Sequence, residues 1–444
     1  MAADLLGNPV TLDGGDRSLA AIDGFVEGFI ASESRAADIL AAADDPTPLV
    51  QACIAAVHMF AESAEAPASA KPFIDRALAS APRVTPREQR LIAAIAAWVD
   101  GDITQAIALH EAQAREHPRD LASLKMGHYH LFNRGDAPGM LRLALASLPK
   151  AADVPYLHGM LAFAWEQCHA LEPAEAAARQ AIAMRRKEPW AHHALAHVML
   201  AQGRIHEGHA FLADVSETWS GLNSFMVTHN WWHQALFALE LDRADEVLAL
   251  YDGQVWGVAK AYTQDQANAV SLLARMELAG IDVGDRWQDV ADYLAARTAD
   301  QVLPFLDMHY LLGLARAGRA DAETLIRNIE AKASRVDASE AAWRDLCLPA
   351  SRGVLAWARG QYAVALRELG QALPRLLEIG GSHAQRDLFS QIHLDAMVRS
   401  GHLQGAQNLL QPQLRAQPES RRLRRQAAGL YQALGLAAVA EQFL

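Results

Sequence analysis

The chain has 444 residues, of which 51% are hydrophobic and only 7% aromatic, and alanine and leucine are prominent. This composition favours helices over strands. The formal net charge is -12, from 52 acidic and 40 basic residues spread along the chain without a long block of one sign. Because binding to phosphates needs clustered Lys and Arg, the charge argues against nucleic acid as a partner.

The cysteines and the N-terminal sequence indicate a cellular compartment. Cys53, Cys168 and Cys347 lie far apart among apolar neighbours, which predicts buried, reduced thiols rather than disulfides or a CxxC metal site. The first residues, MAADLLGNPVTLDGGD, have neither a basic start nor an apolar core of a signal peptide. No apolar run approaches the roughly 20 residues of a membrane span. We therefore expect a soluble, cytoplasmic protein without membrane contact.

A turn recurs at a fixed interval in the first half of the chain. Glycine occupies it at Gly101, Gly135 and Gly203, and His169 takes the same place, so the steps 101 to 135, 135 to 169 and 169 to 203 are each 34 residues. This is the period of the tetratricopeptide repeat (TPR), a unit of two antiparallel helices. The apolar residues between the turns follow helical spacing. The sequence therefore predicts TPR units here.

The second half shows the same turn with a less regular interval. Gly318, Gly360, Gly401 and Gly435 mark turns, and only the step 401 to 435 is again 34 residues. Longer helical hairpins are therefore expected in the middle of the chain, where we predict that Trp287 packs one helix onto its neighbour.

Near the C-terminus, Arg421, Arg422, Arg424 and Arg425 are interpreted as a solvated helix face. No segment has a convincing strand pattern, so the sequence predicts no sheet.

The predicted fold class is all-α, a TPR-like α-solenoid formed as a superhelix of antiparallel helical hairpins. We expect a single domain over residues 1–444. Its predicted parts are irregular N-terminal helical hairpins (1–80), regular 34-residue TPR units (81–220), lengthened helical hairpins (221–360) and C-terminal TPR units (361–444).

Histidine is the unusual residue type, with 18 copies. His193 and His197 are four residues apart, as are His229 and His233, which puts each pair on one face of a helix. Such a pair can hold a divalent metal ion or supply an acid and a base, although neither pair has the HExxH pattern. Packed histidines with a hydrogen bond to a carbonyl are the simpler alternative. Both pairs precede a turn, and first helices line the concave surface of a TPR solenoid, so the pairs are predicted to converge on one groove.

Other side chains join these candidates. Asn230 and Trp232 lie between the second pair of histidines, and Trp232 is the better candidate for the groove than Trp231. Glu166 and Asp307 are candidate carboxylate partners. His309 follows Asp307 by two positions, so the two side chains are not expected to share a helix face.

A glycine pair precedes a further candidate. Gly380 and Gly381 are expected to end one helix, after which Ser382 caps the next and Gln385 completes a capping box. The alternative is an anion site at the helix N-terminus, clamped by Arg386. No Walker loop, dinucleotide-binding fingerprint or GxSxG motif occurs, so those enzyme classes are set aside.

Six stretches of the sequence, in this order, resemble the tetratricopeptide repeat protein 38 family. They are HGMLAFAWE (158–166), WAHHALAH (190–197), HNWWH (229–233), GDRWQD (284–289), DMH (307–309) and GGSHAQRD (380–387). The resemblance implies a TPR-like solenoid without a settled activity or a named cofactor. The family positions it implies are His193, His197, His229, His233, His309, Glu166, Asp307, Gln385, Arg386 and Asp387; His192 lies outside that pattern.

Two functions compete at this stage. The first is a binding protein whose histidine-rich concave groove takes a small polar molecule or a peptide end, and a homo-oligomer is a further possibility. The ligand-binding candidates are His158, His193, His197, Asn230, Trp232, Asp307, His309, Gln385, Arg386 and Asp387. The alternative is a hydrolase or lyase in which His229 and His233 act as acid and base and Glu166 orients them. In a variant of this idea, the two histidine pairs hold a metal ion.

Overall fold

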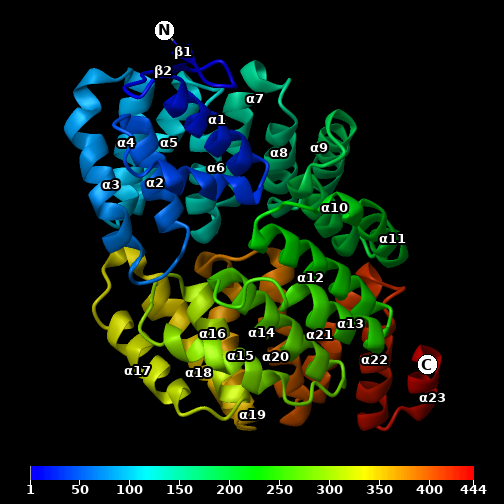
Figure 1. Ribbon diagram of the computed structural model, residues 1–444. Helices are drawn as coiled ribbons and strands as arrows, with labels where there is room; N and C mark the ends of the chain where they lie inside the picture. Colours follow the sequence, from blue (N-terminus) through cyan, green and yellow to red (C-terminus); the bar gives the residue numbers. More distant parts are fainter. Residues whose placement is uncertain (1) are drawn as a thin grey trace. The chain divides into compact units, whose positions relative to one another are not determined.

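The computed structural model describes residues 2–444, and nearly all of its regular structure is helical (Figure 1). The exception is a ribbon of two short antiparallel strands, β1 (Ala2–Ala3) and β2 (Pro9–Val10). The sequence analysis predicted no strand, which is wrong for these residues. The ribbon closes a small loop in which the amide of Asp4 donates to the carbonyl of Asn8 at 2.9 Å.

The chain folds into two compact units. Unit 1 extends to Leu195 and includes Thr218–Met226, whereas unit 2 comprises Ala196–Glu217 and Val227–Leu444. Two continuous helices contribute residues to both units, α10 (Pro189–Ala201) and α12 (Ser224–Glu240). The predicted single superhelical domain stays a prediction.

Unit 1 consists of paired antiparallel helices, for example α2 with α3 and α8 with α9. Apart from short 3-10 turns, its helices are α1 (Asp16–Ile30), α2 (Pro48–Met59), α3 (Ala66–Ser80), α4 (Pro86–Val99), α5 (Ile103–Glu116), α6 (Leu121–Asn133), α7 (Ala137–Ala151), α8 (Pro155–Gln167) and α9 (Leu171–Met184), with a longer 3-10 segment at Ser34–Ala42.

The 34-residue turns have the backbone geometry that their sequence predicts. Gly101 and Gly135 have φ of 82° and 69°, in the left-handed region that favours glycine. His169, the substitute for glycine, also has a positive φ of 58°. After each of the two glycines an aspartate caps the next helix, Asp102 before α5 and Asp136 before α7. The TPR-type turns predicted here are therefore confirmed.

Unit 2 continues the same pattern with longer and less regular connections. Its further helices are α11 (Ile205–Val215), α13 (Ala244–Leu250), α14 (Thr263–Leu278), α15 (Arg286–Leu294), α16 (Pro304–Arg316), α17 (Asp321–Ala333), α18 (Leu348–Ala358), α19 (Tyr362–Ala372), α20 (His383–Arg399), α21 (Leu403–Ala416), α22 (Arg421–Ala433) and α23 (Ala437–Ala440), with π-helical segments at Tyr251–Val255 and Trp343–Cys347 and a 3-10 segment at Leu373–Ile379. The fold class is all-α, a solenoid of helical hairpins, as predicted.

The core of unit 2 lies around α14. This helix packs against α15, α16 and α20, and its residues are buried on all sides. Trp287 of α15 belongs to this core at 5% exposure, in agreement with the predicted packing role. A helix that is buried all round is normally apolar. α14 nevertheless carries buried polar side chains, which are Thr263, Asp265, Gln266, Asn268, Ser271 and Arg275.

The first and last hairpins of unit 2 contact one another. The side-chain amide of Gln417 donates to the carbonyl of Leu200 at 2.8 Å. Arg422 of α22 pairs with Glu240, and Arg425 pairs with Asp242. The sequence analysis assigned this arginine cluster to a solvated face, and that interpretation is wrong for Arg422, whose side chain is only 12% exposed.

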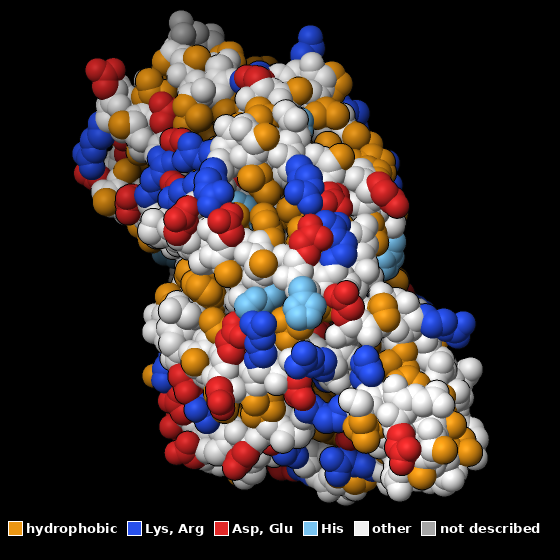
Figure 2. Space-filling view, turned by 90° about the vertical axis from the view of Figure 1, so that its right-hand side faces the viewer, with side chains coloured by type: hydrophobic (Ala, Val, Ile, Leu, Met, Phe, Trp, Pro, Cys, Tyr) orange, Lys and Arg blue, Asp and Glu red, His pale blue; other side chains and the backbone are white. Residues whose placement is uncertain are grey.

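The cysteines and the charged side chains were also predicted from the sequence. All three cysteines are free thiols; Cys53 and Cys347 are buried, and burial raises the pKa of both. Cys168 is half-buried, which corrects the prediction that it is buried. On the face shown in Figure 2, basic and acidic side chains are interspersed. Within residues 2–444, no helix combines the length and the apolar character that crossing a bilayer requires.

Candidate metal centre

The first two histidines are positioned by α10. Pro189 occupies the start of this helix, where its fixed φ fits and its missing N–H leaves no lost bond. The carboxylate of Glu188 accepts a hydrogen bond from the amide of Ala191 and so caps the first turn. Glu188 is accommodated because Gly159 of α8 has no Cβ, which would lie 2.5 Å from its Oε2 atom. His193 and His197 then project from one face of a capped helix.

The second pair is positioned by α12. Asn223 precedes this helix, and its side-chain oxygen accepts from the amide of Met226 at 2.8 Å. His229 and His233 follow on one face, with ring centroids 4.8 Å apart and the ring planes nearly perpendicular. The ring of His233 also lies 4.5 Å from that of His197 on α10, centroid to centroid. The imidazoles of His197 and His233 therefore contact one another between α10 and α12.

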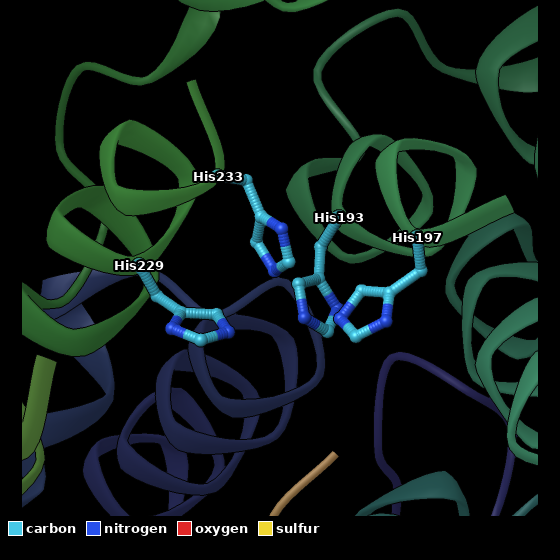
Figure 3. A group of neighbouring side chains, drawn as sticks. All are labelled: His193, His197, His229 and His233. Carbon is cyan, nitrogen blue, oxygen red and sulfur yellow. The ribbon is translucent and has the colours of Figure 1, made fainter. Parts of the chain in front are cut away.

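Four imidazoles form one cluster. His197, His229 and His233 belong to unit 2, and His193 precedes His197 by one turn of the same continuous helix. One ring nitrogen from each of the four lies within 4.8 Å of the others, and no further group of three or more such ligands is found among the described residues. In Figure 3 the four side chains extend from their two helices toward a common region. The predicted gathering of the two histidine pairs is confirmed.

The cluster is shielded from water. His193 and His197 are 2% exposed, His229 is 1% exposed and His233 is fully buried. Burial lowers the pKa of His229 to about 3, with a smaller contribution from the neighbouring His197. His229 is therefore neutral at physiological pH, as an imidazole must be to bind a metal ion.

Aromatic rings hold the imidazoles in place. The indole of Trp232 stacks on the ring of His229 with centroids 5.1 Å apart and planes 9° apart. The rings of Phe163 and Trp190 lie 5.0 Å and 4.9 Å from that of His193. Trp232 is fully buried in the core of unit 2, and its predicted role in ligand binding stays a prediction.

Two residues of α14 that the sequence analysis missed support α12. Asn268 Oδ1 lies 3.0 Å from His229 Nδ1. One turn earlier, Asp265 accepts a hydrogen bond of 2.7 Å from the hydroxyl of Thr228. No motif marks these residues, and the sequence of α14 mixes polar and apolar side chains along its length.

The arrangement fits a transition-metal ion. Four nitrogen ligands around a tetrahedral zinc ion, each at about 2.0 to 2.1 Å, lie roughly 3.3 Å from one another. The largest separation within the cluster, 4.8 Å, exceeds this, so the imidazoles would close around an ion by small rotations. Imidazole nitrogen suits Zn²⁺, Cu²⁺ and Ni²⁺, whereas Mg²⁺ and Ca²⁺ prefer oxygen.

Two other predicted residues make local contacts in unit 1. His158 donates from Nε2 to the carbonyl of Ala152 at 2.8 Å and so ties α8 to the turn before it. Glu166 is 2% exposed and accepts from the side chain of Gln167. Their predicted roles in ligand binding and in orienting a base stay predictions.

Asp307 and His309 both lie on α16, and their side chains bond to different residues, as their spacing predicted. The carboxyl group of Asp307 accepts from Gln301 at 3.0 Å, and burial raises its pKa to about 8. His309 donates from Nδ1 to the carbonyl of Phe305 at 2.8 Å, and burial lowers its pKa to about 4. Asn230, on α12, is fully buried. Roles for these three in ligand binding stay predictions.

The Gly-Gly segment forms the predicted helix cap. Gly380 and Gly381 both have positive φ, and Ser382 and Gln385 form the capping box of α20. Arg386 donates to the carbonyl of Gly381, so the guanidinium contacts its own turn.

Asp387 pairs with the buried Arg275 of α14 at 3.0 Å, and Arg275 Nη2 also donates to the carbonyl of Ala384 at 2.6 Å. These contacts tie α20 to α14. The ligand-binding roles of Gln385, Arg386 and Asp387 stay predictions.

The comparisons with known proteins concern the fold. No protein-family model matches the chain. Similar solved structures include the human IFIT1 dimer with m7Gppp-AAAA, at 10% identity and a TM-score of 0.43 over 98% of this chain and 94% of that chain. The human IFIT1 dimer with PPP-AAAA matches at 10% identity and a TM-score of 0.43, over 95% and 93%. Naa15/Naa10 bound to HypK-THB matches at 14% identity and a TM-score of 0.26, over 96% and 68%.

The low TM-scores carry no argument about individual residues. Membership of the tetratricopeptide repeat protein 38 family stays a prediction.

One sequence prediction is corrected by these structures. The net charge of -12 and the lack of a long basic block along the sequence were taken to argue against nucleic acid as a partner, but the similar IFIT1 structures hold the oligonucleotides m7Gppp-AAAA and PPP-AAAA. The exclusion is therefore wrong as it stands. Binding of phosphates depends on the local placement of basic side chains, which a net charge does not report.

Proposed function

We propose that the chain is a TPR-type binding protein whose ligand is a divalent transition-metal ion, held by His193, His197, His229 and His233. The observation that carries this proposal is the convergence of four imidazole nitrogens to within 4.8 Å of one another.

The donor set determines the class of ion. All four ligands are nitrogens, and the cluster contains no carboxylate oxygen. Zn²⁺ accepts such a set in tetrahedral geometry, and Cu²⁺ and Ni²⁺ also bind imidazole strongly. Ca²⁺ and Mg²⁺ would lose their hydration shells without gaining oxygen ligands. We therefore name zinc as the first ion to test.

Binding is favoured over catalysis at this centre. A catalytic zinc site has three protein ligands and keeps one position open for water or substrate, whereas a structural site uses four. Here four side chains, each at most 2% exposed, supply the full tetrahedral set. The metal-dependent variant of the hydrolase or lyase alternative lacks an open coordination position to support it.

The surroundings offset part of the charge of an ion. Four neutral imidazoles leave the two positive charges of a bound ion in a buried place, where an uncompensated charge is costly. Asp265 is 1% exposed, and its carboxylate accepts from Thr228, the neighbour of His229 in the chain. When it is ionised, this carboxylate offsets part of the charge of an ion bound beside it.

The test is metal analysis of the full-length protein. After removal of metal with a chelator, the protein is incubated with Zn²⁺, desalted and measured for zinc by mass spectrometry. We expect one zinc ion per chain, and its loss in His197→Ala and in His233→Ala. His192→Ala is the matched control, because His192 is also fully buried on α10 but bonds to Arg186 and Trp219. Wild-type protein without zinc would overturn the proposal, as would equal losses in the control.

Cobalt provides an independent test of the geometry. Co²⁺ in a tetrahedral site absorbs visible light far more strongly than in an octahedral one, so the spectrum of the cobalt-loaded protein reports the coordination geometry. We expect the tetrahedral spectrum in the wild type and in His192→Ala. A spectrum of octahedral cobalt would contradict a centre of four histidines.

A further inference from the structure

A polar stripe runs along α14 although the helix lies inside the core of unit 2. Asp265, Asn268, Ser271 and Arg275 are three or four residues apart and are each at most 4% exposed. This spacing places them on one side of the helix. Because buried polar groups cost free energy unless they are bonded, each needs a partner on a neighbouring helix or on α14 itself.

Asn268 is the member of the stripe with a described contact to the histidine cluster. Asn268 Oδ1 lies 3.0 Å from His229 Nδ1, whereas Asp265 bonds to Thr228. Ser271 Oγ lies 3.4 Å from Nε of Arg275 and so faces another part of the stripe. Asn268 is therefore placed to act on a histidine ligand.

The contact selects one tautomer of His229. A side-chain carbonyl oxygen only accepts hydrogen bonds, so His229 Nδ1 must carry the hydrogen and donate it. A neutral imidazole has one N–H, which leaves Nε2 with its lone pair. Figure 3 shows that one ring nitrogen of His229 faces the other three imidazoles while the second faces away. The nitrogen facing the cluster is then unprotonated and ready to bind a metal ion.

We infer that Asn268 is a positioning residue of the metal centre, which fixes His229 with the proton on Nδ1 and with Nε2 as its ligand atom. This inference rests on the proposed function. Metal-binding histidines commonly donate their second ring N–H to such an acceptor, which sets the orientation and basicity of the ring. Asn268 supplies this acceptor from a buried helix, and the indole of Trp232 stacks on the same imidazole ring.

The side-chain amide of Asn268 also sets how basic the imidazole of His229 is, and so how tightly it binds a metal ion. A carboxylate at this position would make the imidazole more basic and bind the ion more tightly. Here the carboxylate of the stripe is Asp265, which accepts a hydrogen bond from the hydroxyl of Thr228. α14 therefore presents a neutral acceptor to the ligand, with the carboxyl group of Asp265 one turn away. Replacement of Asn268 by Asp converts the neutral acceptor into a charged one of nearly the same shape.

The first experiment measures the tautomer of the metal-free wild-type protein. Long-range ¹H–¹⁵N NMR of histidine side chains separates Nδ1–H from Nε2–H, and His229→Gln identifies the signals of His229. We expect His229 to carry its proton on Nδ1. A proton on Nε2 in the wild type overturns the inference, and this measurement needs neither bound zinc nor a variant of Asn268.

The second experiment measures zinc affinity by competition with a coloured chelator. Loss of an acceptor of this kind typically weakens metal affinity by about 10 to 100-fold, so we expect that loss in Asn268→Ala. Asn268→Asp should bind at least as tightly as the wild type. Ser271→Ala is the matched control, since it removes a polar group of the same buried stripe without touching His229. Helical content by circular dichroism shows whether each variant is folded.

The outcomes separate this inference from the proposed function. If the wild type binds no zinc, the proposed metal site fails, and the tautomer measured in the metal-free protein still decides the role of Asn268. If the wild type binds zinc but Asn268→Ala stays within about twofold of it, Asn268 does not position the ligand. If Asn268→Ala is unfolded, equal or tighter binding by Asn268→Asp supports the inference and weaker binding overturns it.

Discussion

Nε of Arg422 lies 2.8 Å from the carboxylate of Glu240, although 182 residues separate the two in the chain. The same carboxylate accepts from the hydroxyl of Ser420, the residue that caps α22. Both charged side chains are largely buried, at 12% and 10% exposure. This pair joins the C-terminal hairpin to the end of α12, the helix that carries His229 and His233.

Neutralising Glu240 should destabilise unit 2. In Glu240→Gln the charge of Arg422 is left without its partner in a largely buried place, which typically costs about 3 kcal/mol or somewhat more. Urea unfolding measures the change. Glu378→Gln is the control, because the Arg375–Glu378 pair is 54% and 35% exposed and such pairs contribute below about 1 kcal/mol. Equal effects of the two changes would show that the Arg422–Glu240 pair does not hold the hairpin.

Two turn glycines both have positive φ, but only one of them is also closely packed. Gly101 has φ of 82° and open space where the methyl group of an alanine would lie, whereas Gly203 has φ of 70° and its Cβ would lie 2.5 Å from the carbonyl oxygen of Ala416. Alanine at either position is strained by about 1 to 2 kcal/mol. We expect a larger loss of stability in Gly203→Ala than in Gly101→Ala, because only the former also pushes the C-terminal hairpin away.

Thermal unfolding of the two glycine variants gives the comparison, and hydrogen exchange of α21 and α22 locates the effect. Faster exchange there in Gly203→Ala alone would support the contact between the first and last hairpins of unit 2. Indistinguishable exchange in the two variants would argue against it.

Asp307 should make stability depend on pH. Burial raises its pKa from 3.8 to about 8, with smaller effects from Gln301 and Asp300. Between these values the folded protein holds a proton that the unfolded chain has released, so stability is full below about pH 4 and falls as pH rises toward 8. The slope for one such group is at most about 1.4 kcal/mol per pH unit. Asp307→Asn removes this slope.

The measurement is urea unfolding of the wild type and Asp307→Asn between pH 5 and pH 8. The variant should gain stability relative to the wild type as pH rises. The nearby groups that also carry charge are Asp300 and Lys332, and they are common to both proteins. Asp345→Asn serves as a control, since the pKa of Asp345 is lowered by Arg344 and its charge is constant over this range. A stability difference between wild type and Asp307→Asn that does not change with pH would rule out the shift.

Zinc should protect α10 and α12 from hydrogen exchange. An ion that binds only the folded state stabilises it by about 2.7 kcal/mol when its free concentration is 100 times the dissociation constant. Because the ligands are His193 and His197 on one helix and His229 and His233 on the other, exchange should slow in these two helices first. The protection should vanish in His233→Ala and persist in His192→Ala. Uniform protection of the whole chain, or none, would contradict binding at this centre.

Local features of the sequence determined the helical repeats and the histidine pairs. Gly101, Gly135 and Gly203 end helices because they adopt positive φ easily, and this property depends on the residue and its neighbours alone. The spacing of His193 from His197 fixes both on one helix face, whatever else the helix touches. The predominance of helix also followed from the local helix propensities of the residues.

Tertiary structure alone decided which helices meet. That α10 and α12 bring four imidazoles together depends on how the helices cross, and the sequence pattern of one helix does not contain that information. The contacts of Asn268 and Asp265 with α12 were not predicted, because a buried polar residue is recognised only once its partner on another helix is known. Arg422 was taken for a surface residue because its partner, Glu240, lies 182 residues away. Helical periodicity acts over a few residues, whereas packing and charge pairing join residues at any separation along the chain.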